Sequence, residues 1–376
     1  MKRILLYSET HEPYLETFVT LLNLMGNNEI FIATHEKRID WLLKTNPAVY
    51  SNVKFIKLNE LLFFKRTPVK ASLNSVKNYI EIKKAIQNNK IDTFVVLEIY
   101  DWRLQILMSF DFSFEYLNKV LTIHEIHRYF RVDANLTKKY NLPTPRKYRI
   151  RFLKKFNKIV VLQDNVKKTL KVKYGIDSII IPFKLTESVY IEKRKNFLQD
   201  CNEHKIKFVV TGIVDSRRKN FYSIIDAFSA FSKESYELVF LGKVIERDII
   251  DYAKKKNINL KYFDSYLSEN EFNNEIITSH FLIGLMSNKS PYGELKTSGI
   301  VFDGASLGVP VIINNEDLTL KDGLFIVTQN LEATLKEIIN HFETSKYYEK
   351  YGKPALDKMM ANTAEKYISN MEKLLE

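Results

Sequence analysis

The segment that decides the fold is Ser290–Asn314. It reads Ser-Pro-Tyr-Gly-Glu-Leu-Lys-Thr-Ser-Gly-Ile-Val-Phe-Asp-Gly-Ala-Ser-Leu-Gly-Val-Pro-Val-Ile-Ile-Asn. A predicted strand ends just before it, near Met286, and another begins at Pro310. Between the strands, a helix is expected to begin at Thr297–Gly299 and to end at Gly308. Strand, loop, helix and further apolar strand together form the repeating unit of parallel α/β architecture.

The start of this predicted helix suits an anionic ligand. Thr297, Ser298 and Gly299 leave backbone N–H groups at the positive end of the helix dipole, where a phosphate binds well. Lys296 adds positive charge at the same place. Asp303, about five residues into the helix, is within reach of a ribose whose phosphates lie at the helix start. An ordinary capped helix in a Rossmann-like domain is the alternative interpretation.

Short apolar runs alternate with helix-length amphipathic segments along the whole chain, which is typical of α/β proteins. Strands are predicted at Arg3–Ser8, Glu29–Thr34, Val53–Leu58, Thr93–Tyr100, Lys119–Ile126, Lys158–Gln163, Ser178–Phe183, Lys207–Val214, Tyr236–Leu241, Asn259–Phe263, Phe281–Met286, Pro310–Asn314 and Leu324–Thr328. A polar stretch at 187–205 separates two series of strands. We therefore expect one α/β domain at 1–186, a linker at 187–205, a second α/β domain at 206–355 and a final helix at 356–376.

Length and composition support two globular domains and limit the classes of protein. The chain has 376 residues, 45% of them hydrophobic, which is enough for two cores. The single Cys, Cys201, excludes a disulfide framework and a Cys-based zinc site. No apolar run is long enough for a signal peptide or a membrane span, so a cytoplasmic protein is expected.

The positive charge is concentrated in the first half of the chain. Residues 1–190 hold 32 Lys and Arg against 18 Asp and Glu, a net charge of +14, whereas residues 191–376 hold 25 against 27, a net of −2. A solvated basic surface explains this distribution, and so does a domain that faces an anionic partner such as a membrane leaflet. No recognised nucleic-acid-binding motif accompanies the charge, so we expect no nucleic acid partner.

A second candidate site follows the first strand of the second half. Gly212-Ile-Val-Asp-Ser-Arg-Arg-Lys-Asn places Arg217, Arg218 and Lys219 at a turn from a strand into a helix. Open α/β sheets bind ligands at the carboxyl ends of their strands, where these three cations are expected. Cations near a helix N-terminus oppose its dipole, so an anionic ligand explains them better than a solvated helix start. Arg and Lys can stabilise a diphosphate leaving group without a metal ion.

These two segments resemble the C-terminal domain of the retaining, group 1 type of GT-B glycosyltransferase. In that family a Gly ends the first strand, basic residues follow it, and a helix-opening loop and an acidic residue grip the nucleotide. The matching positions here are Gly212, Arg217, Arg218, Lys219, Thr297–Gly299 and Asp303. The resemblance implies an α/β protein of GT-B fold, with two Rossmann-like domains facing each other across a cleft. It also implies that the last helix crosses back onto the first domain.

The first domain carries one further motif of this family. Val120-Leu-Thr-Ile-His-Glu resembles the strand that ends in a His followed by an acidic residue. The resemblance implies that His124 lies near the transferred sugar. A strand-end His that only satisfies a backbone group is the alternative interpretation.

The resemblance implies transfer of a sugar from a nucleotide diphosphate donor, most commonly a UDP-sugar, with retention of configuration. The acceptor would be a glycan or lipid-linked saccharide, as in bacterial surface polysaccharide synthesis. Arg218 and Lys219 would stabilise the leaving diphosphate, and Glu294 would contact sugar hydroxyls. No cofactor or metal is implied, and the sequence has no Asp-x-Asp for a metal.

Two basic segments of the first domain suggest where the acceptor side meets a membrane. Leu61-Leu-Phe-Phe-Lys-Arg is followed by Lys70, Lys77, Lys83 and Lys84, and the segment 144–156 has Tyr148, Phe152 and Phe156 at every fourth position. We expect these aromatic side chains to pack on the sheet and the cations to lie outside. Peripheral association with the inner face of an anionic membrane follows from this interpretation.

Two departures from the family pattern support a different function. Ser8-Glu-Thr-His-Glu-Pro-Tyr stands where the family has a Gly-Gly loop. In addition, the position eight residues before Asp303 holds Leu295, and Glu294 is one position away from it. A catalytically inactive GT-B partner or chaperone of an active transferase is therefore the alternative, and an epimerase on the same fold is another. The sequence does not indicate the oligomeric state.

Overall fold

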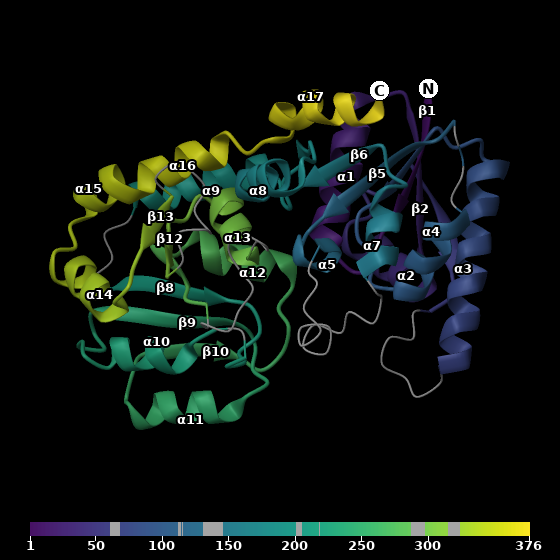
Figure 1. The fold of residues 1–376 in the computed structure, drawn as a ribbon. Helices are drawn as coiled ribbons and strands as arrows, with labels where there is room; N and C mark the ends of the chain where they lie inside the picture. Colours follow the sequence, from purple (N-terminus) through teal and green to yellow (C-terminus); the bar gives the residue numbers. More distant parts are fainter. Residues whose placement is uncertain are drawn as a thin grey trace. The chain divides into compact units, whose positions relative to one another are not determined.

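The chain folds into two compact α/β units in a computed structural model (Figure 1). The structure describes residues 1–60, 68–111, 114, 116–130, 146–200, 205–217, 219–286, 298–314 and 324–376. Unit 1 comprises Met1–Lys184 and Ala364–Glu376, and unit 2 comprises Leu185–Thr363. The chain therefore leaves unit 1 once and returns to it for its last helix.

Unit 1 is built on a parallel sheet with the strand order β3-β2-β1-β4-β5-β6-β7 in the described part of the chain. Its strands are β1 (Lys2–Tyr7), β2 (Asn28–His35), β3 (Val53–Leu58), β4 (Thr93–Val96), β5 (Asn118–Ile123), β6 (Lys158–Val161) and β7 (Ile179–Ile180). The central strand β4 is buried at every position, as expected for a parallel strand covered by helices on both faces. The edge strand β3 is only partly buried.

Helices connect and cover these strands. They are α1 (Glu12–Met25), α2 (Glu36–Thr45), α3 (Pro68–Asn88), α4 (Trp102–Asp111), α5 (His127–Phe130), α7 (Arg146–Leu153), α8 (Asp164–Tyr174) and the C-terminal α17 (Ala364–Leu375). Helix α17 packs against α1, and the side chain of Asn118 donates to the carbonyl of Leu374 at 2.6 Å. The last helix is thus an integral part of unit 1.

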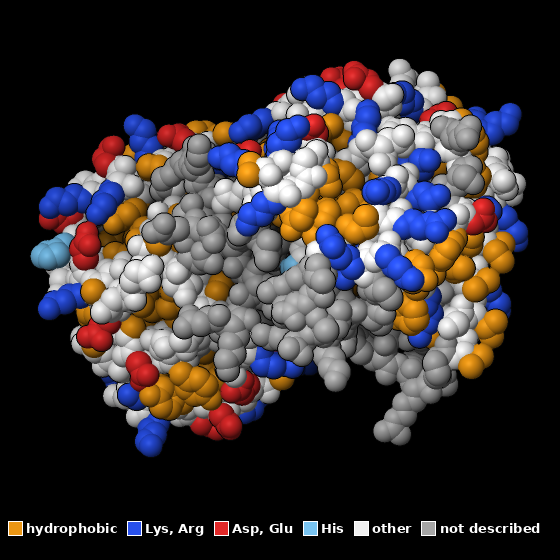
Figure 2. Space-filling model, in the orientation of Figure 1, with side chains coloured by type: hydrophobic (Ala, Val, Ile, Leu, Met, Phe, Trp, Pro, Cys, Tyr) orange, Lys and Arg blue, Asp and Glu red, His pale blue; other side chains and the backbone are white. Residues whose placement is uncertain are grey.

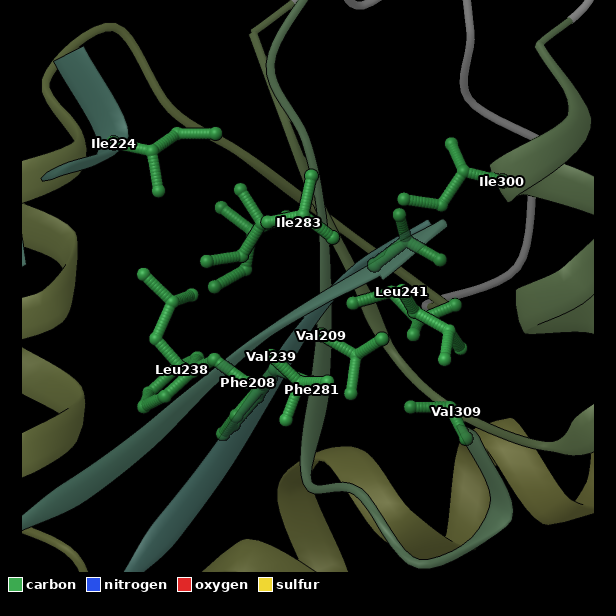
Figure 3. Packing of buried hydrophobic residues seen from close by; sticks show 14 of the residues in the cluster. Phe208, Val209, Ile224, Leu238, Val239, Leu241, Phe281, Ile283, Ile300 and Val309 are labelled. Atoms are coloured by element: carbon green, nitrogen blue, oxygen red, sulfur yellow. The ribbon is translucent and has the colours of Figure 1, made fainter. Parts of the chain in front are cut away.

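Unit 2 repeats the same architecture with the strand order β10-β9-β8-β11-β12-β13 in its described residues. The strands are β8 (Ile206–Thr211), β9 (Tyr236–Lys243), β10 (Leu260–Phe263), β11 (Phe281–Gly284), β12 (Val311–Ile313) and β13 (Phe325–Val327). Figure 3 shows Phe208, Val239 and Ile283 of this sheet between Ile224 of one helix and Ile300 of another. Each strand predicted from the sequence is present in one of the two sheets.

The helices of unit 2 are α9 (Ser188–Gln199), α10 (Phe221–Phe228), α11 (Arg247–Lys255), α12 (Glu269–Ile277), α13 (Gly299–Leu307), α14 (Leu331–Asn340), α15 (Thr344–Tyr347), the π-helical turn η2 (Tyr348–Gly352) and α16 (Lys353–Met360). The capping box at the start of α12 forms as its sequence predicts, with Glu271 N–H donating to Ser268 Oγ at 3.3 Å and Ser268 N–H to the Glu271 carboxylate at 2.9 Å. Helix α13 ends, as expected, at Gly308 in the left-handed conformation, with φ 67°.

Residues 188–199, expected within a linker, form helix α9 and belong to unit 2. Arg194 of α9 is fully buried. Its guanidinium donates to the carbonyl of Gly308 at 2.9 Å and to those of Ile277 and Ser279 at 2.7 Å each. It also donates to the Tyr347 hydroxyl at 3.0 Å. One buried side chain therefore caps the carboxyl ends of α12 and α13, where the helix dipole favours positive charge.

The expected helix at 356–376 is likewise divided. Its first part lies in α16, which stays in unit 2, and its second part is α17 of unit 1. Within the described residues, no helix is both long and apolar enough to cross a membrane.

Each sheet has one position where the direction of strand succession reverses. In unit 1 the reversal lies between β1 and β4, and in unit 2 between β8 and β11. Loops leave the carboxyl ends of such neighbouring strands in opposite directions, so a crevice opens between them, and open α/β sheets bind their ligands there. These two positions are where functional residues should lie.

Candidate functional site

The turn after β8 in unit 2 requires glycine at two positions. Gly212 has φ 94°, a left-handed conformation that disfavours a side chain. A Cβ atom on Gly242, at the end of the neighbouring β9, would lie 2.3 Å from the carbonyl oxygen of Gly212. The two backbones can approach this closely only without that side chain. At these two positions the turn therefore presents backbone atoms, and no side chain, at the carboxyl edge of the sheet.

Lys219 lies at the reversal point of this sheet. It is 9% exposed, and its ammonium group donates to the carbonyl of Thr211, the last residue of β8. Its backbone bridges to Met286, which follows β11. The adjoining Asn220 N–H donates to the Leu285 carbonyl at 3.2 Å. A largely buried positive charge thus lies between the carboxyl ends of β8 and β11.

Arg217 takes a different position from Lys219. Its side chain is 80% exposed, and its Nε lies 2.9 and 2.8 Å from the two carboxylate oxygens of Asp215. The backbone N–H of Arg217 donates to the same carboxylate at 2.9 Å. The hydrogen bond to Asp215 raises the pKa of the guanidinium further. Arg217 is therefore a surface cation held by its own loop, and Lys219 is the inward-facing one.

The start of α13 lies beside the end of β11. Ser298 precedes the helix, is buried, and makes no capping hydrogen bond with its side chain. In the first turn, Ile300 packs on Gly284 at the end of β11, so closely that a Cβ on Gly284 would lie 3.0 Å from the Ile300 side chain. Asp303 is partly exposed one turn further along α13. The N-terminus of α13 and Asp303 therefore lie on one helix whose first turn packs against the end of β11.

Four predicted site residues, Arg218, Glu294, Lys296 and Thr297, lie outside the described residues. Of the others in unit 2, the structure brings Gly212 and Lys219 together, with the Gly212 Cβ position 3.9 Å from the Lys219 Nζ. It places Ser298, Gly299 and Asp303 on the neighbouring helix start.

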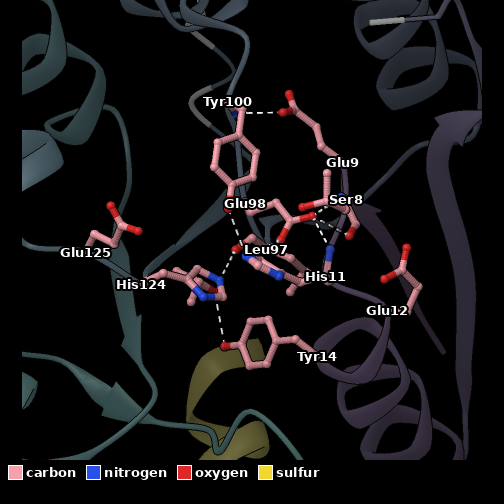
Figure 4. A network of polar contacts seen from close by, with 12 residues as sticks. Ser8, Glu9, His11, Glu12, Tyr14, Leu97, Glu98, Tyr100, His124 and Glu125 are labelled. Atoms are coloured by element: carbon pink, nitrogen blue, oxygen red, sulfur yellow. Dashed lines mark hydrogen bonds and ion pairs between the residues drawn. The ribbon is translucent and has the colours of Figure 1, made fainter. Parts of the chain in front are cut away.

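The loop after β1 in unit 1 is organised by a buried carboxylate, as Figure 4 shows. Glu98, which follows β4, accepts hydrogen bonds from the backbone N–H groups of Thr10 and His11, the second at 2.6 Å. It also accepts from the Ser8 hydroxyl at 3.3 Å. A second carboxylate, Glu9, accepts from the Tyr100 N–H at 2.6 Å. This loop has no Gly-Gly, and its N–H groups are satisfied by an internal anion.

His124 lies at the end of β5 beside this loop (Figure 4). Its Nε2 donates to the carbonyl of Leu97 at 2.9 Å, so in the neutral ring Nδ1 is the acceptor. The ring stacks on His11 with 4.9 Å between centroids, and Tyr14 contacts its face edge-on at 5.1 Å. The Nε2 of His11 is in turn 2.9 Å from the Tyr100 hydroxyl. His124 therefore has the backbone hydrogen-bond partner of a strand-end His with a purely structural role. It also lies in a cluster of polar side chains.

The charges in this cluster depend on one another. Burial raises the pKa of Glu98, but the coulombic interactions and hydrogen bonds around the carboxylate, led by the interaction with His11, together outweigh burial and lower the pKa. The guanidinium of Arg38 and the N–H of Thr10 act in the same direction. Glu98 is therefore the ionised centre of the cluster at neutral pH.

Burial has the opposite consequence for two other members. It raises the pKa of Glu9 to about 8, with the carboxylates of Asp101 and Glu98 adding to the rise. It lowers the pKa of His124 to about 4, with the positive charge of His11 adding to the fall. At pH 7 the His124 imidazole is uncharged, so it can accept or donate a hydrogen bond but supplies no full positive charge.

The lowered pKa of His124 predicts how acid affects unit 1. The unfolded chain binds a proton at His near pH 6.5, and the folded unit only near pH 4, so stability is complete above pH 6.5 and is lost as the pH falls towards 4. The stability cost at pH 5 relative to pH 7 is on the order of 2 kcal/mol. His124→Gln, which can keep the bond to Leu97, should lose that much less between these pH values. Urea midpoints measured at both pH values for the two proteins check this; equal losses would contradict it.

The sequence did not single out Glu9, His11, Glu98 or Tyr100. One signal was available, because Glu98 interrupts an apolar strand-like run at its carboxyl end, where charged residues in parallel sheets often serve a ligand or a loop. The partner loop at 8–11 lies about ninety residues earlier in the chain. Their contact depends on the adjacency of β1 and β4, which local patterns do not reveal.

The second basic segment, part of which forms α7, differs from the prediction. Phe152 is buried, as expected, and contacts Phe156, but Arg149 is also buried and donates to the carbonyl of Arg128. Arg151 lies over Phe110 and donates to a neighbouring backbone carbonyl. Arg149 and Arg151 therefore hold α7 in place, because each donates a hydrogen bond to a backbone carbonyl of a neighbouring segment. No group of His, Cys, Asp and Glu in the described ranges is arranged to hold a metal ion.

Comparisons with known proteins agree with this architecture. No family model and no curated protein sequence matches the chain. Among solved structures, a glycosyltransferase from Rickettsia africae matches with a TM-score of 0.67 and 14% identity, over 100% of this chain and 97% of that one. Alr3699/HepE of Anabaena, in complex with UDP and glucose, matches with a TM-score of 0.62 and 11% identity, over 100% and 99%.

A third match is a UDP-GlcNAc 2-epimerase from Neisseria meningitidis bound to UDP-GlcNAc. Its TM-score is 0.59 at 13% identity, over 99% of this chain and 100% of that one. The matches therefore span a transferase and an epimerase, and at these identities they establish the fold alone. The chain has the GT-B fold, with two parallel-sheet α/β units, as its sequence predicts.

Proposed function

We propose that the protein is a glycosyltransferase that moves a sugar from a nucleotide diphosphate donor, a UDP-sugar, to a glycan or lipid-linked saccharide. The observation that carries the proposal is the position of Lys219. It is a largely buried cation between the carboxyl ends of β8 and β11, and the first turn of α13 packs on Gly284 at the end of β11. A diphosphate is the ligand chemistry that combines a buried ammonium with helix N–H donors at this place.

The other residues of unit 2 have roles that follow from their positions. The N–H groups at Ser298 and Gly299 would bind phosphate oxygens, and Thr297 and Lys296 would contribute to the same site. Asp303 would accept hydrogen bonds from ribose hydroxyls. Gly212 would let the backbone approach the ligand, since its conformation disfavours a side chain. Arg217, held by Asp215, would act as a peripheral cation.

The proposed chemistry is departure of the diphosphate with retention at the sugar carbon. Arg218 and Lys219 would stabilise the charge that develops on the leaving oxygen, an effect that is strongest in a water-excluded site. The acceptor hydroxyl would attack from the face that the leaving group vacates, so no carboxylate nucleophile is required. In unit 1, His124 would contact the sugar as a neutral imidazole, and Glu294 of unit 2 would contact sugar hydroxyls. We propose that the reaction needs no metal ion.

A catalytically inactive partner subunit is the second candidate. One observation favours it: the N–H groups of the loop after β1 are occupied by Glu98. In the family that the sequence resembles, a Gly-Gly loop stands at this place. Donor turnover distinguishes the two candidates, because an inactive partner could bind a nucleotide without consuming its sugar donor.

The proposal is tested by thermal shifts with a panel of nucleotide sugars, followed by product analysis. A donor present at about 100 times its Kd should add about 2.7 kcal/mol of stability. That corresponds to a rise in Tm of about 5 °C or more. Nuclear magnetic resonance of the product, or of the sugar released from donor hydrolysis, should show the anomeric configuration of the donor. Absence of stabilisation by every nucleotide would contradict the proposed function, and an inverted product would contradict retention alone.

We also propose that the protein acts in surface polysaccharide synthesis, with the basic unit 1 on the acceptor side. The net charge of +14 over residues 1–190 supports peripheral association with the inner, cytoplasmic face of an anionic membrane.

A further inference from the structure

Helix α3 has an apolar stripe on the side that faces away from unit 1. Val69, Leu73, Val76 and Ile80 are 72%, 55%, 42% and 43% exposed. Their spacing of four, three and four residues places them on one line along the helix, about 16 Å long. The buried residues of α3, among them Ile82, lie on the opposite side of the helix. In Figure 2, apolar side chains run down the right-hand edge of the molecule, over α3.

Lysines border this stripe. Lys70, Lys77 and Lys84 are exposed and lie along one side of it, because each is displaced by about 60–100° around the helix from the line of apolar residues. Lys83 lies on the other side and donates to the carboxylate of Asp111 at 2.9 Å. An exposed apolar stripe edged by cations is the pattern of a helix that lies in a membrane interface.

We propose that α3 is a membrane-docking helix of this protein and that the α3 stripe, Val69, Leu73, Val76 and Ile80, enters the headgroup boundary of an anionic bilayer. Lys70 and Lys77 contact the lipid headgroups. The proposal rests on the membrane association included in the proposed function and not on the donor chemistry. It assigns that association to α3 rather than α7, whose Arg149 and Arg151 bind backbone carbonyls within unit 1.

A second copy of the chain fits this surface less well. A symmetric interface along the stripe would bring the lysine rows of two α3 helices close together, and like charges at an interface are unfavourable. An anionic bilayer offers an apolar interior to the stripe and opposite charge to the lysines at once. Charge complementarity therefore favours the bilayer as the occupant.

Vesicle co-sedimentation of the full chain tests the proposal. The vesicles are phosphatidylcholine alone and phosphatidylcholine with roughly a third of phosphatidylserine. The double variant Leu73→Ser and Ile80→Ser should bind the mixed vesicles at least about tenfold more weakly than the native chain, because the inserted apolar area is lost. Lys70→Gln with Lys77→Gln should lose about tenfold on mixed vesicles and nothing on neutral ones.

Matched controls come from α8 of the same unit. Val172→Ser removes an even more exposed apolar side chain, and Lys167→Gln with Lys168→Gln removes two exposed lysines. These variants should change binding by less than about twofold. Equal losses in the control and α3 variants would overturn the assignment to α3, as would native protein that does not bind mixed vesicles. An altered oligomeric state in the Leu73/Ile80 variant, with vesicle binding unchanged, would show that the stripe is a protein interface.

The donor chemistry is measured separately in the same proteins. Titration with UDP should give the same affinity in the native chain and in all four variants. Loss of vesicle binding with UDP binding intact supports docking through α3. Failure of every protein to bind UDP or any other nucleoside diphosphate would contradict the proposed function and would leave the result on docking unaffected.

Discussion

Replacing Lys219 by methionine is expected to lower the rate of sugar transfer by about 10²–10³-fold, while the protein remains folded. The ammonium group is largely buried at the carboxyl end of β8, where a leaving diphosphate would develop its charge. Methionine keeps most of the length and apolar volume of the lysine stem, so packing around the residue is preserved. Single-turnover rates with the preferred nucleotide sugar measure the effect directly.

The control for this variant is Lys233→Met, which removes an exposed lysine of the same unit. It should leave the transfer rate unchanged, and both variants should keep the native circular dichroism spectrum. A native transfer rate in Lys219→Met would contradict the proposal that Lys219 stabilises the leaving diphosphate. Arg218→Ala should also abolish transfer, because both cations are proposed to stabilise the same leaving diphosphate.

Replacing Arg194 by methionine is expected to destabilise unit 2 by about 3–5 kcal/mol. The substitution leaves three buried carbonyl oxygens and the Tyr347 hydroxyl without the donors that now satisfy them. It also removes a positive charge from the carboxyl ends of α12 and α13. For a unit of this size, the Tm should fall by about 10 °C. Differential scanning calorimetry of the full chain checks the value.

Two further variants serve as comparisons for Arg194→Met. Arg194→Lys keeps the charge but offers a single ammonium instead of a planar fork, so its loss should be intermediate. Lys195→Met, on the exposed side of the same helix, should change stability by less than about 0.5 kcal/mol. A loss below about 1 kcal/mol for Arg194→Met would show that water replaces the guanidinium and that the buried bonds matter little.

The same arginine explains why the sequence predicted a linker where α9 lies. Tyr190, Arg194 and Leu198 recur at every fourth position and form the buried face of the helix. A charged residue in the middle of that face makes the segment look polar. Its acceptors come from Ile277, Ser279 and other residues far along the chain, and a local pattern contains no information about them. The strands, by contrast, were predictable, because a run of apolar residues buried on both faces needs no distant partner to be recognised.

The candidate sites of the two units differ in the same way. In unit 2, Gly212, Lys219 and the start of α13 each belong to a continuous motif with its own local geometry, so the sequence could propose them as candidates. In unit 1 the site depends on Glu98 reaching the loop at 8–11 across the sheet. Such a contact follows from strand order, which the sequence does not state. The pairing of Arg217 with Asp215 is local, and the Asp two residues before the basic run is its signal in the sequence.

Isothermal titration calorimetry with UDP tests the nucleotide site of unit 2 most directly. The native chain should bind one UDP per chain, and Lys219→Met should bind it about 10–100-fold more weakly, the value of a charge-assisted hydrogen bond. Lys233→Met should bind as the native chain does. Absence of binding by UDP and by every other nucleoside diphosphate, or equal affinity in the native and Lys219 variant proteins, would contradict a nucleotide-diphosphate site between β8 and β11.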